Sequence, residues 1–160
     1  MDYILLGIGN PIRADDGIGC YIADEFSRKI LQSKLKNKGS KTNAWKIINT
    51  GTMPENFTSV IRKENPEFVV MVDSAELGLS PGEFRIISKE KLEKMHLTTH
   101  AMPLSFVMSY IEEFCEKVIL IGIQPKVLGN SEEISAELKA AAKKIISVLE
   151  KREFEKIPYL

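Results

Sequence analysis

Four short apolar runs constrain the fold of this chain more than any other feature. They cover residues 3–9, 45–50, 68–74 and 117–123. Each run is rich in β-branched residues and is followed by Gly, Pro, Asn or Asp, which is typical of strands buried on both faces of a parallel sheet. The sequence therefore predicts at least four buried strands.

Apolar residues between these runs recur at helical spacing. The predicted helices cover residue 18 to about residue 37, residues 104–114 and residues 134–149. Alternating strands and helices predict an α/β protein with a three-layer sandwich and right-handed crossovers.

A fifth run, GEFRIIS at residues 82–88, follows a Pro-Gly turn with no helix before it. A strand that enters so soon after the previous one is expected to run antiparallel, at or near a sheet edge. The tail from Arg152 onward is expected to be a frayed end.

Length and charge limit the class of protein. A chain of 160 residues fits one domain, over residues 1–160. Its 22 basic and 22 acidic residues cancel, so no net field favours nucleic acid or anionic lipid, and no run is long enough for a membrane span. Cys20 and Cys115 lie far apart in apolar surroundings, which favours buried reduced thiols. We therefore expect a cytoplasmic enzyme or binding module.

The segment GIGNPIRADDG at residues 7–17 follows the first predicted strand, as a phosphate-binding loop would. Ile12 stands where a dinucleotide fingerprint has its third glycine, so the close helix packing which that glycine allows is not specified. No Gly-Lys-Ser/Thr follows, and the second strand ends in Asn49-Thr50-Gly51 without a ribose-binding acid. Two adjacent aspartates would also repel a pyrophosphate. The pattern argues against nucleotide binding.

Instead, this loop brings Asp15 and Asp16 to the mouth of the sheet. One aspartate is enough to cap the following helix, which leaves the other for a separate role. Asp73 closes a buried strand, where a carboxylate must be solvated, hydrogen-bonded or bound to a cation. If the first and third strands are neighbours, with the second outside the first, the two acidic segments face each other across a switch-point crevice. Purely structural roles for these aspartates remain open.

The chain has two histidines, His96 and His100. His96 lies among lysines and glutamates and is expected at the surface. His100 comes shortly before Pro103-Leu104, the expected first turn of a helix. Two carboxylates and one imidazole suit a borderline divalent metal. No HExxH zinc motif and no G-x-S-x-G elbow occurs in the sequence.

Five segments then point to one family. GIGNPIRADDGIG, GTMPENF, VDSAELGLSPGEFRII, TTHAMPLSF and LIGIQP, in this order, resemble the hydrogenase maturation endopeptidases, which process the large subunits of nickel–iron hydrogenases. The likeness covers about residues 3–125. VDSAELGLSPGEFRII is most similar to the subfamily that serves formate-hydrogenlyase-type and related energy-converting hydrogenases.

The resemblance implies a phosphorylase/hydrolase-like three-layer α/β/α sandwich around a five-stranded, mostly parallel sheet with one antiparallel strand. It also implies that Asp16, Asp73 and His100 are both the catalytic residues and the metal ligands. Asp15 matches the preceding family aspartate, for which capping or support of its neighbours is implied. Some members carry Glu where this chain has Asp16.

The implied reaction removes a C-terminal extension from the large-subunit precursor after nickel has been inserted. The nickel is carried by the precursor, so no tightly bound metal is expected in the isolated enzyme. Whether an acid activates water or the metal polarises the scissile carbonyl stays open. Two alternatives also stay open: a zinc-dependent hydrolase with the same trio, and a nickel-responsive escort that does not cut.

We expect the cleft to be formed by the loops at residues 9–17, 51–56, 73–82 and 98–103. The substrate-binding residues expected there are Gly9, Asn10, Gly51 and Thr52.

Overall fold

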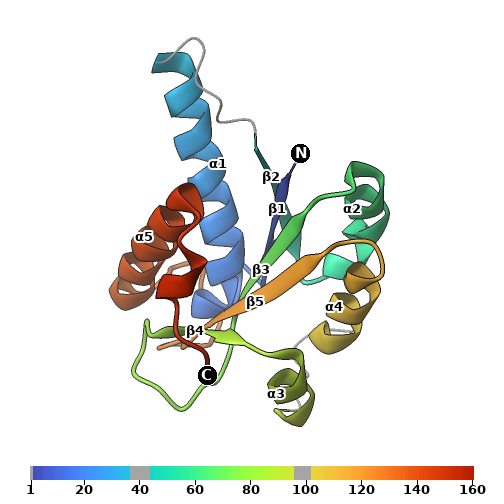
Figure 1. Ribbon diagram of the computed structural model, residues 1–160. Coiled ribbons are helices and arrows are strands. Elements are labelled where there is room, and N and C mark those ends of the chain that lie inside the picture. The colour runs from blue at the N-terminus through green and yellow to red at the C-terminus, as the bar shows by residue number, and fades with distance from the viewer. Residues whose placement is uncertain (1, 37–43, 96–101) are drawn as a thin grey trace.

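The computed structural model describes residues 2–36, 44–95 and 102–160. A five-stranded sheet runs through the middle of the molecule in the order β2-β1-β3-β5-β4 (Figure 1). The strands are β1 (Tyr3–Ile8), β2 (Trp45–Gly51), β3 (Phe68–Ser74), β4 (Phe84–Ile87) and β5 (Lys117–Ile123). Only β4 is antiparallel to its neighbour, and it lies at the sheet edge. The predicted sheet is confirmed.

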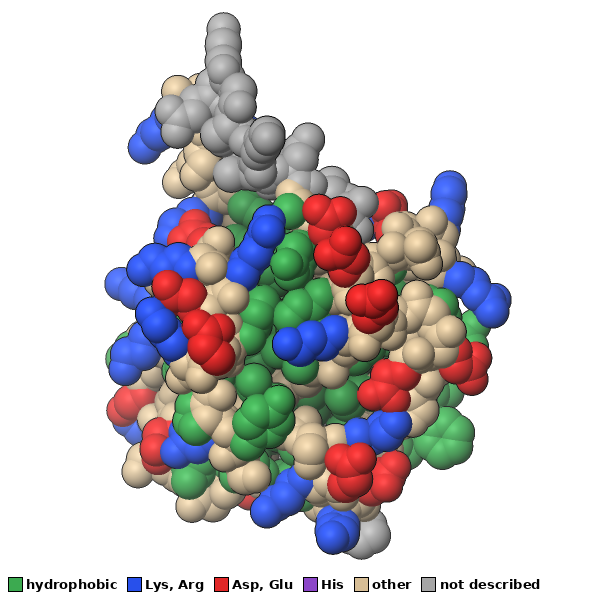
Figure 2. Space-filling view, viewed as in Figure 1, with side chains coloured by type: hydrophobic (Ala, Val, Ile, Leu, Met, Phe, Trp, Pro, Cys, Tyr) green, Lys and Arg blue, Asp and Glu red, His purple; other side chains and the backbone are tan. Residues whose placement is uncertain are grey.

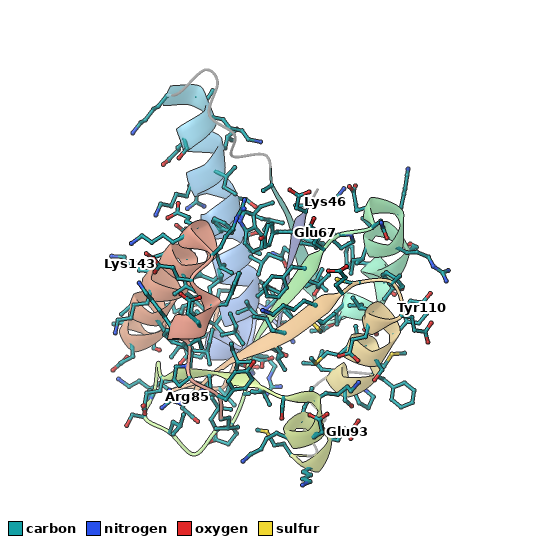
Figure 3. All side chains as sticks on the ribbon, viewed as in Figure 1. Lys46, Glu67, Arg85, Glu93, Tyr110 and Lys143 are labelled. Carbon is teal, nitrogen blue, oxygen red and sulfur yellow. The ribbon has the colours of Figure 1, made fainter. Side chains whose placement is uncertain are left out.

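Helices cover both faces of this sheet. They are α1 (Ile18–Lys36), α2 (Thr58–Glu64), α3 (Lys89–Lys94), α4 (Leu104–Glu112) and α5 (Ala136–Lys151). Helices α1 and α5 lie on one face; α2 and α4 lie on the other, with α3 beside α4 (Figure 1). Lys143 on α5 and Tyr110 on α4 mark the outer sides of the two helical layers (Figure 3). Three 3-10 turns complete the elements: η1 (Ala14–Gly17), η2 (Pro54–Phe57) and η3 (Phe154–Lys156).

The strands alternate their side chains between two buried cores. On β1, Leu5 packs into the core under α1 and α5, whereas Ile4 and Leu6 pack into the core under α2 and α4. On β3, Val70 and Met71 divide in the same way. Because both faces are covered, these strands are apolar throughout, and this is why they could be recognised as continuous runs.

Helix α1 packs unusually close to the sheet, and Gly19 makes this possible. A Cβ atom added at Gly19 would lie 2.1 Å from the carbonyl oxygen of Ile8 and 2.4 Å from that of Val72. Gly7 faces the helix in turn, since a Cβ there would lie 2.2 Å from the carbonyl oxygen of Gly19. Close packing between helix and sheet, which Ile12 does not provide, is thus provided by Gly19 in the first turn of α1.

The C-terminal segment is not a frayed end, and this prediction was wrong. Phe154 and Ile157 are buried in the core beneath α5. The backbone N–H of Ile86 donates to the carbonyl of Pro158 at 2.9 Å, and the N–H of Leu160 donates to the carbonyl of Ile86 at 3.0 Å. The last residues therefore cover the outer edge of β4, which would otherwise present unpaired backbone groups.

Charge is mixed over the surface in view. Basic and acidic side chains are interspersed on the face that Figure 2 shows, in keeping with equal numbers of each in the sequence. None of the helices in the described ranges is both long and apolar enough to span a membrane.

Candidate functional site

The candidate site lies at the edge where the four parallel strands end. β1 and β3 are neighbours, with β2 outside β1 and β5 beyond β3. The connections of β1 and β3 therefore lead away in opposite directions, which creates a switch point at their carboxyl ends (the lower edge in Figure 1). This is the arrangement on which the sequence-based prediction of the crevice depended.

Asp16 lies buried in η1, between the end of β1 and the start of α1. Its Oδ1 accepts a hydrogen bond from the hydroxyl of Ser74, at the end of β3, at 2.8 Å. Its carbonyl oxygen accepts from the backbone N–H of Asn10 at 3.1 Å. Asp16 is thus held against both strands that border the crevice.

Asp73 is buried one residue before Ser74 on β3 and is paired with Gly122 of β5. Strand alternation turns its side chain toward the α2 and α4 layer, whereas that of Ser74 turns toward α1. The pKa of the Cys20 thiol is raised to about 11, chiefly by burial and to a smaller extent by the negative charges of Asp24, Asp73 and Asp16. Asp16 and Asp73 are thus both buried near the end of β3, Asp16 through its contact with Ser74, and a shared role for the two side chains stays a prediction.

The four predicted substrate-binding residues lie along the same edge. Gly9 has a φ of 155°, and a Cβ there would lie 2.1 Å from the carbonyl oxygen of Asp16. The backbone N–H of Gly9 donates to the carbonyl of Gly51 at 3.0 Å, which joins the two loops. A Cβ at Gly51 would meet no atom within 4 Å. Asn10, which follows Gly9, and Thr52, which follows Gly51, are both half-buried. Their role in binding stays a prediction.

His100, the third member of the predicted trio, lies outside the described residues, as does His96. Pro103 precedes α4, as the sequence predicted. Within residues 2–36, 44–95 and 102–160, no group of three or more His, Cys, Asp and Glu side chains is arranged to hold a metal ion. The two-carboxylate half of the trio can thus be described, and the three-ligand set stays a prediction.

Asp15 has a role that is separate from that of Asp16. It is fully buried, and it does not cap η1, whose N-cap residue makes no side-chain cap hydrogen bond. Its Oδ2 accepts from the backbone N–H groups of Lys126 and Val127, both at 2.9 Å, and from the Ser135 hydroxyl at 2.9 Å. Its Oδ1 accepts from the Ser135 N–H at 2.8 Å. Of the two roles that the resemblance implies for Asp15, support of its surroundings agrees with these contacts, and the supported segment is residues 126–135.

These hydrogen bonds determine the ionisation of Asp15. Burial alone would raise its pKa, but the bonds from Ser135, Val127 and Lys126 together lower it below the usual 3.8. Since the native pKa is lower than the unfolded one, the charged form stabilises the fold above pH 3.8. This contribution is lost as the pH falls through the native pKa.

Asp15→Asn should lower the free energy of unfolding by about 1–3 kcal/mol at pH 7, because an amide offers one acceptor oxygen where four donors converge. Urea denaturation measures this, with Asp24→Asn as the matched control. Asp24 is exposed and accepts from the Asn49 side chain, so its change should stay below about 0.5 kcal/mol. The difference in the free energy of unfolding between wild type and Asp15→Asn should become smaller below pH 3.8. Equal free energies of unfolding at pH 7 would contradict the supporting role of Asp15.

Comparison with known proteins gives the family. The sequence model of HycI, hydrogenase maturation protease, matches residues 30–152. The hydrogenase 3 maturation protease of Escherichia coli K12 is 33% identical over 151 residues, which cover 94% of this chain and 90% of that protein. The chain belongs to the hydrogenase maturation protease family.

Solved structures of the hydrogenase maturation protease family share the fold. The solution structure of the endopeptidase HycI from Escherichia coli has a TM-score of 0.84 and 31% identity, and the match covers 100% of this chain and 97% of that one. The crystal structure of a NiFe hydrogenase maturation protease HycI from Thermococcus kodakarensis has a TM-score of 0.77 and 33% identity, covering 93% and 90%. Both are of the HycI type, which fits the predicted subfamily.

In this member of the hydrogenase maturation protease family, Gln124 holds the loop that follows Asp73. It is buried just after β5, and its Oε1 accepts from the backbone N–H groups of Leu77 at 2.7 Å and Leu79 at 3.3 Å. Its Nε2 donates to Glu76 at 2.9 Å. Gln124 has no predicted role from sequence, although it is a polar residue directly after a buried strand, as Asp73 is a polar residue at the end of one.

Proposed function

We propose that this chain is the endopeptidase that removes the C-terminal extension from the nickel-loaded large-subunit precursor of a nickel–iron hydrogenase. The observation that carries the proposal is the pair of buried carboxylates, Asp16 and Asp73, at the switch point of a hydrogenase maturation protease. Burial of a carboxylate has to be offset by hydrogen bonds, an ion or a proton. Asp16 has a hydrogen bond from Ser74, and two acids at the carboxyl edge of an otherwise apolar sheet suit a bound cation or a proton transfer.

Hydrolysis by an activated water fits the groups at this site. Cys20 is buried, donates to the carbonyl of Gly9 at 3.4 Å and has a pKa of about 11, so it is a neutral thiol and a poor nucleophile at neutral pH. Ser74 donates its hydroxyl hydrogen to Asp16. A carboxylate that accepts the proton of an attacking water, and returns one to the departing amine, completes peptide hydrolysis without a covalent intermediate.

The nickel ion belongs to the precursor in this proposal. Asp16, Asp73 and His100 would offer it two carboxylate groups and one imidazole, a set without soft ligands. The thiolates of the precursor would supply the remaining affinity. Contact between the trio and the ion would then test whether the precursor is ready to be cut, and the subtype of the protease would be aspartic-type and metal-directed.

The site of action proposed is the cytoplasm. Cys20 and Cys115 are both free and buried, which suits a reducing compartment.

Mass spectrometry of a nickel-loaded precursor, before and after incubation with this protein, tests the proposed function. The expected result is a shortened large subunit together with one released C-terminal peptide. Binding without peptide release would favour the escort alternative. Cleavage of unrelated peptides by a zinc-loaded form would favour the general zinc hydrolase.

A further inference from the structure

Three exposed apolar side chains lie on two segments that are joined beside Asp16. Ile12, Val127 and Leu128 are 60%, 51% and 53% exposed, and we call them the apolar ledge. The N–H of Ser131 donates to the carbonyl of Ile12 at 3.2 Å, and the N–H of Asp15 donates to the carbonyl of Val127 at 3.1 Å. These backbone bonds hold the two segments against each other.

The ledge is held in place by a buried charge. Asp15 accepts four hydrogen bonds from residues 126–135, two of them from Lys126 and Val127 themselves. Burying a carboxylate is unfavourable unless hydrogen bonds compensate for it, and these four bonds all come from this segment. Single exposed apolar residues need no explanation, but three of them on two segments that backbone hydrogen bonds join, one segment being fixed by a buried carboxylate, do need one.

The ledge is continuous with the candidate site. Ile12 lies in a turn in which the N–H of Arg13 donates to the carbonyl of Asn10 at 3.1 Å, and Asp16 closes the next turn, in which its N–H donates to the carbonyl of Arg13 at 3.2 Å. The segment that carries Val127 and Leu128 follows β5, the strand paired with the Asp73 end of β3. A peptide that lies across Asp16 and Asp73 must leave the site over the bordering loops, and the ledge is an apolar part of that border.

The charges around the ledge have both signs. Lys126 pairs with Glu137 at 2.6 Å, Arg13 is exposed, and Glu132 and Glu133 are exposed on the same segment. Binding of nucleic acid or an anionic membrane would require a predominantly positive surface, and the surface around the ledge is not predominantly positive. A mixed border around an apolar centre suits an apolar peptide.

We propose that the apolar ledge binds an apolar stretch of the precursor's C-terminal extension and so selects which extensions are cleaved. The proposal rests on the proposed function and adds the class of substrate: an extension with apolar side chains close to the scissile bond. Asp15 is then a positioning residue, because it acts on the peptide through residues 126–135.

The test is a Val127→Ser/Leu128→Ser double variant assayed on nickel-loaded precursor. KM should rise about tenfold, because burial of two half-exposed apolar side chains is lost, while kcat at saturating precursor is retained. The matched control is Leu31→Ser/Leu35→Ser, which removes two exposed apolar side chains (58% and 74%) from the far part of α1. This control should keep the wild-type KM.

A second comparison excludes a trivial loss of folding. A precursor whose apolar extension residues are replaced by serine should be cleaved with the same KM by wild type and by the ledge variant. Ile12→Ser, on the other segment, should reproduce the rise in KM on the natural extension. An unchanged KM, or a fall in kcat alone, would overturn the ledge proposal and leave the proposed function intact. If wild type releases no peptide, the proposed function itself is wrong.

Discussion

Asp73→Asn should reduce cleavage of the nickel-loaded precursor by about two to four orders of magnitude, the range over which general acid–base groups contribute. The amide keeps the size of the side chain but loses the charge that accepts a proton or binds a cation. Asp73 is near the end of β3, and it pairs with Gly122 of β5 through backbone groups. The substitution changes only the side chain, so the sheet should form as before. Quantifying the released C-terminal peptide over time, with circular dichroism on the same sample, measures both effects.

The matched control for this substitution is Asp2→Asn. Asp2 is exposed and lies just before β1, at the opposite edge of the sheet. It makes the same chemical change far from the crevice, and cleavage should stay within about twofold of wild type, as expected for a surface substitution. If Asp73→Asn instead unfolds far below the wild-type temperature and keeps full activity, Asp73 is a structural residue.

The sheet could be predicted from sequence because its strands are buried on both faces. Such strands read as continuous apolar runs, and the short Pro-Gly turn before β4 set that strand apart as antiparallel. The positions of Asp16 and Asp73 followed from the same logic. Carboxyl ends of neighbouring parallel strands meet at one edge, so the turn after β1 lies against the end of β3, where Asp16 contacts Ser74.

Elements with little periodicity of their own were missed. Helices α2 and α3 span 7 and 6 residues, fewer than two full turns of amphipathic pattern. The segment after Arg152 was read as frayed because it is short and charged, yet Phe154 and Ile157 pack into the core. Its order comes from backbone hydrogen bonds with β4 and from the contact of Phe154 with Phe68 on β3, which lie far away in the chain and leave no local signal.

The role of Asp15 could not be assigned for a similar reason. Its partners are more than 110 residues away, in a segment that reads as an ordinary polar loop. Local sequence offered helix capping as the nearest use for one of two adjacent aspartates. Gly19 is a second example. From sequence, a glycine inside a helix only lowers the helix propensity, whereas in the structure it makes room for the carbonyl groups of Ile8 and Val72.

The ligands available in this chain determine what its site can do with nickel. Thiolates would be needed to hold the ion tightly, and burial raises the pKa of both thiols, that of Cys20 to about 11. Cys115 also lies between α4 and β5, at the opposite edge of the sheet, and donates to the carbonyl of Lys117 at 3.3 Å. Neither cysteine is therefore expected to bind nickel as a thiolate. The carboxylates of Asp16 and Asp73 would instead contact an ion that the precursor already binds.

Cleavage should therefore depend on nickel in the precursor and not on metal added to this protein. Chelator-treated enzyme, incubated with nickel-loaded and with nickel-free precursor, should release the C-terminal peptide only from the loaded form. Nickel added to the enzyme and then removed by gel filtration should not rescue cleavage of the nickel-free precursor, because an oxygen- and nitrogen-only set binds the ion weakly. Equal release from both precursors would refute metal-gated recognition, and it would make the general zinc hydrolase the better account of Asp16 and Asp73.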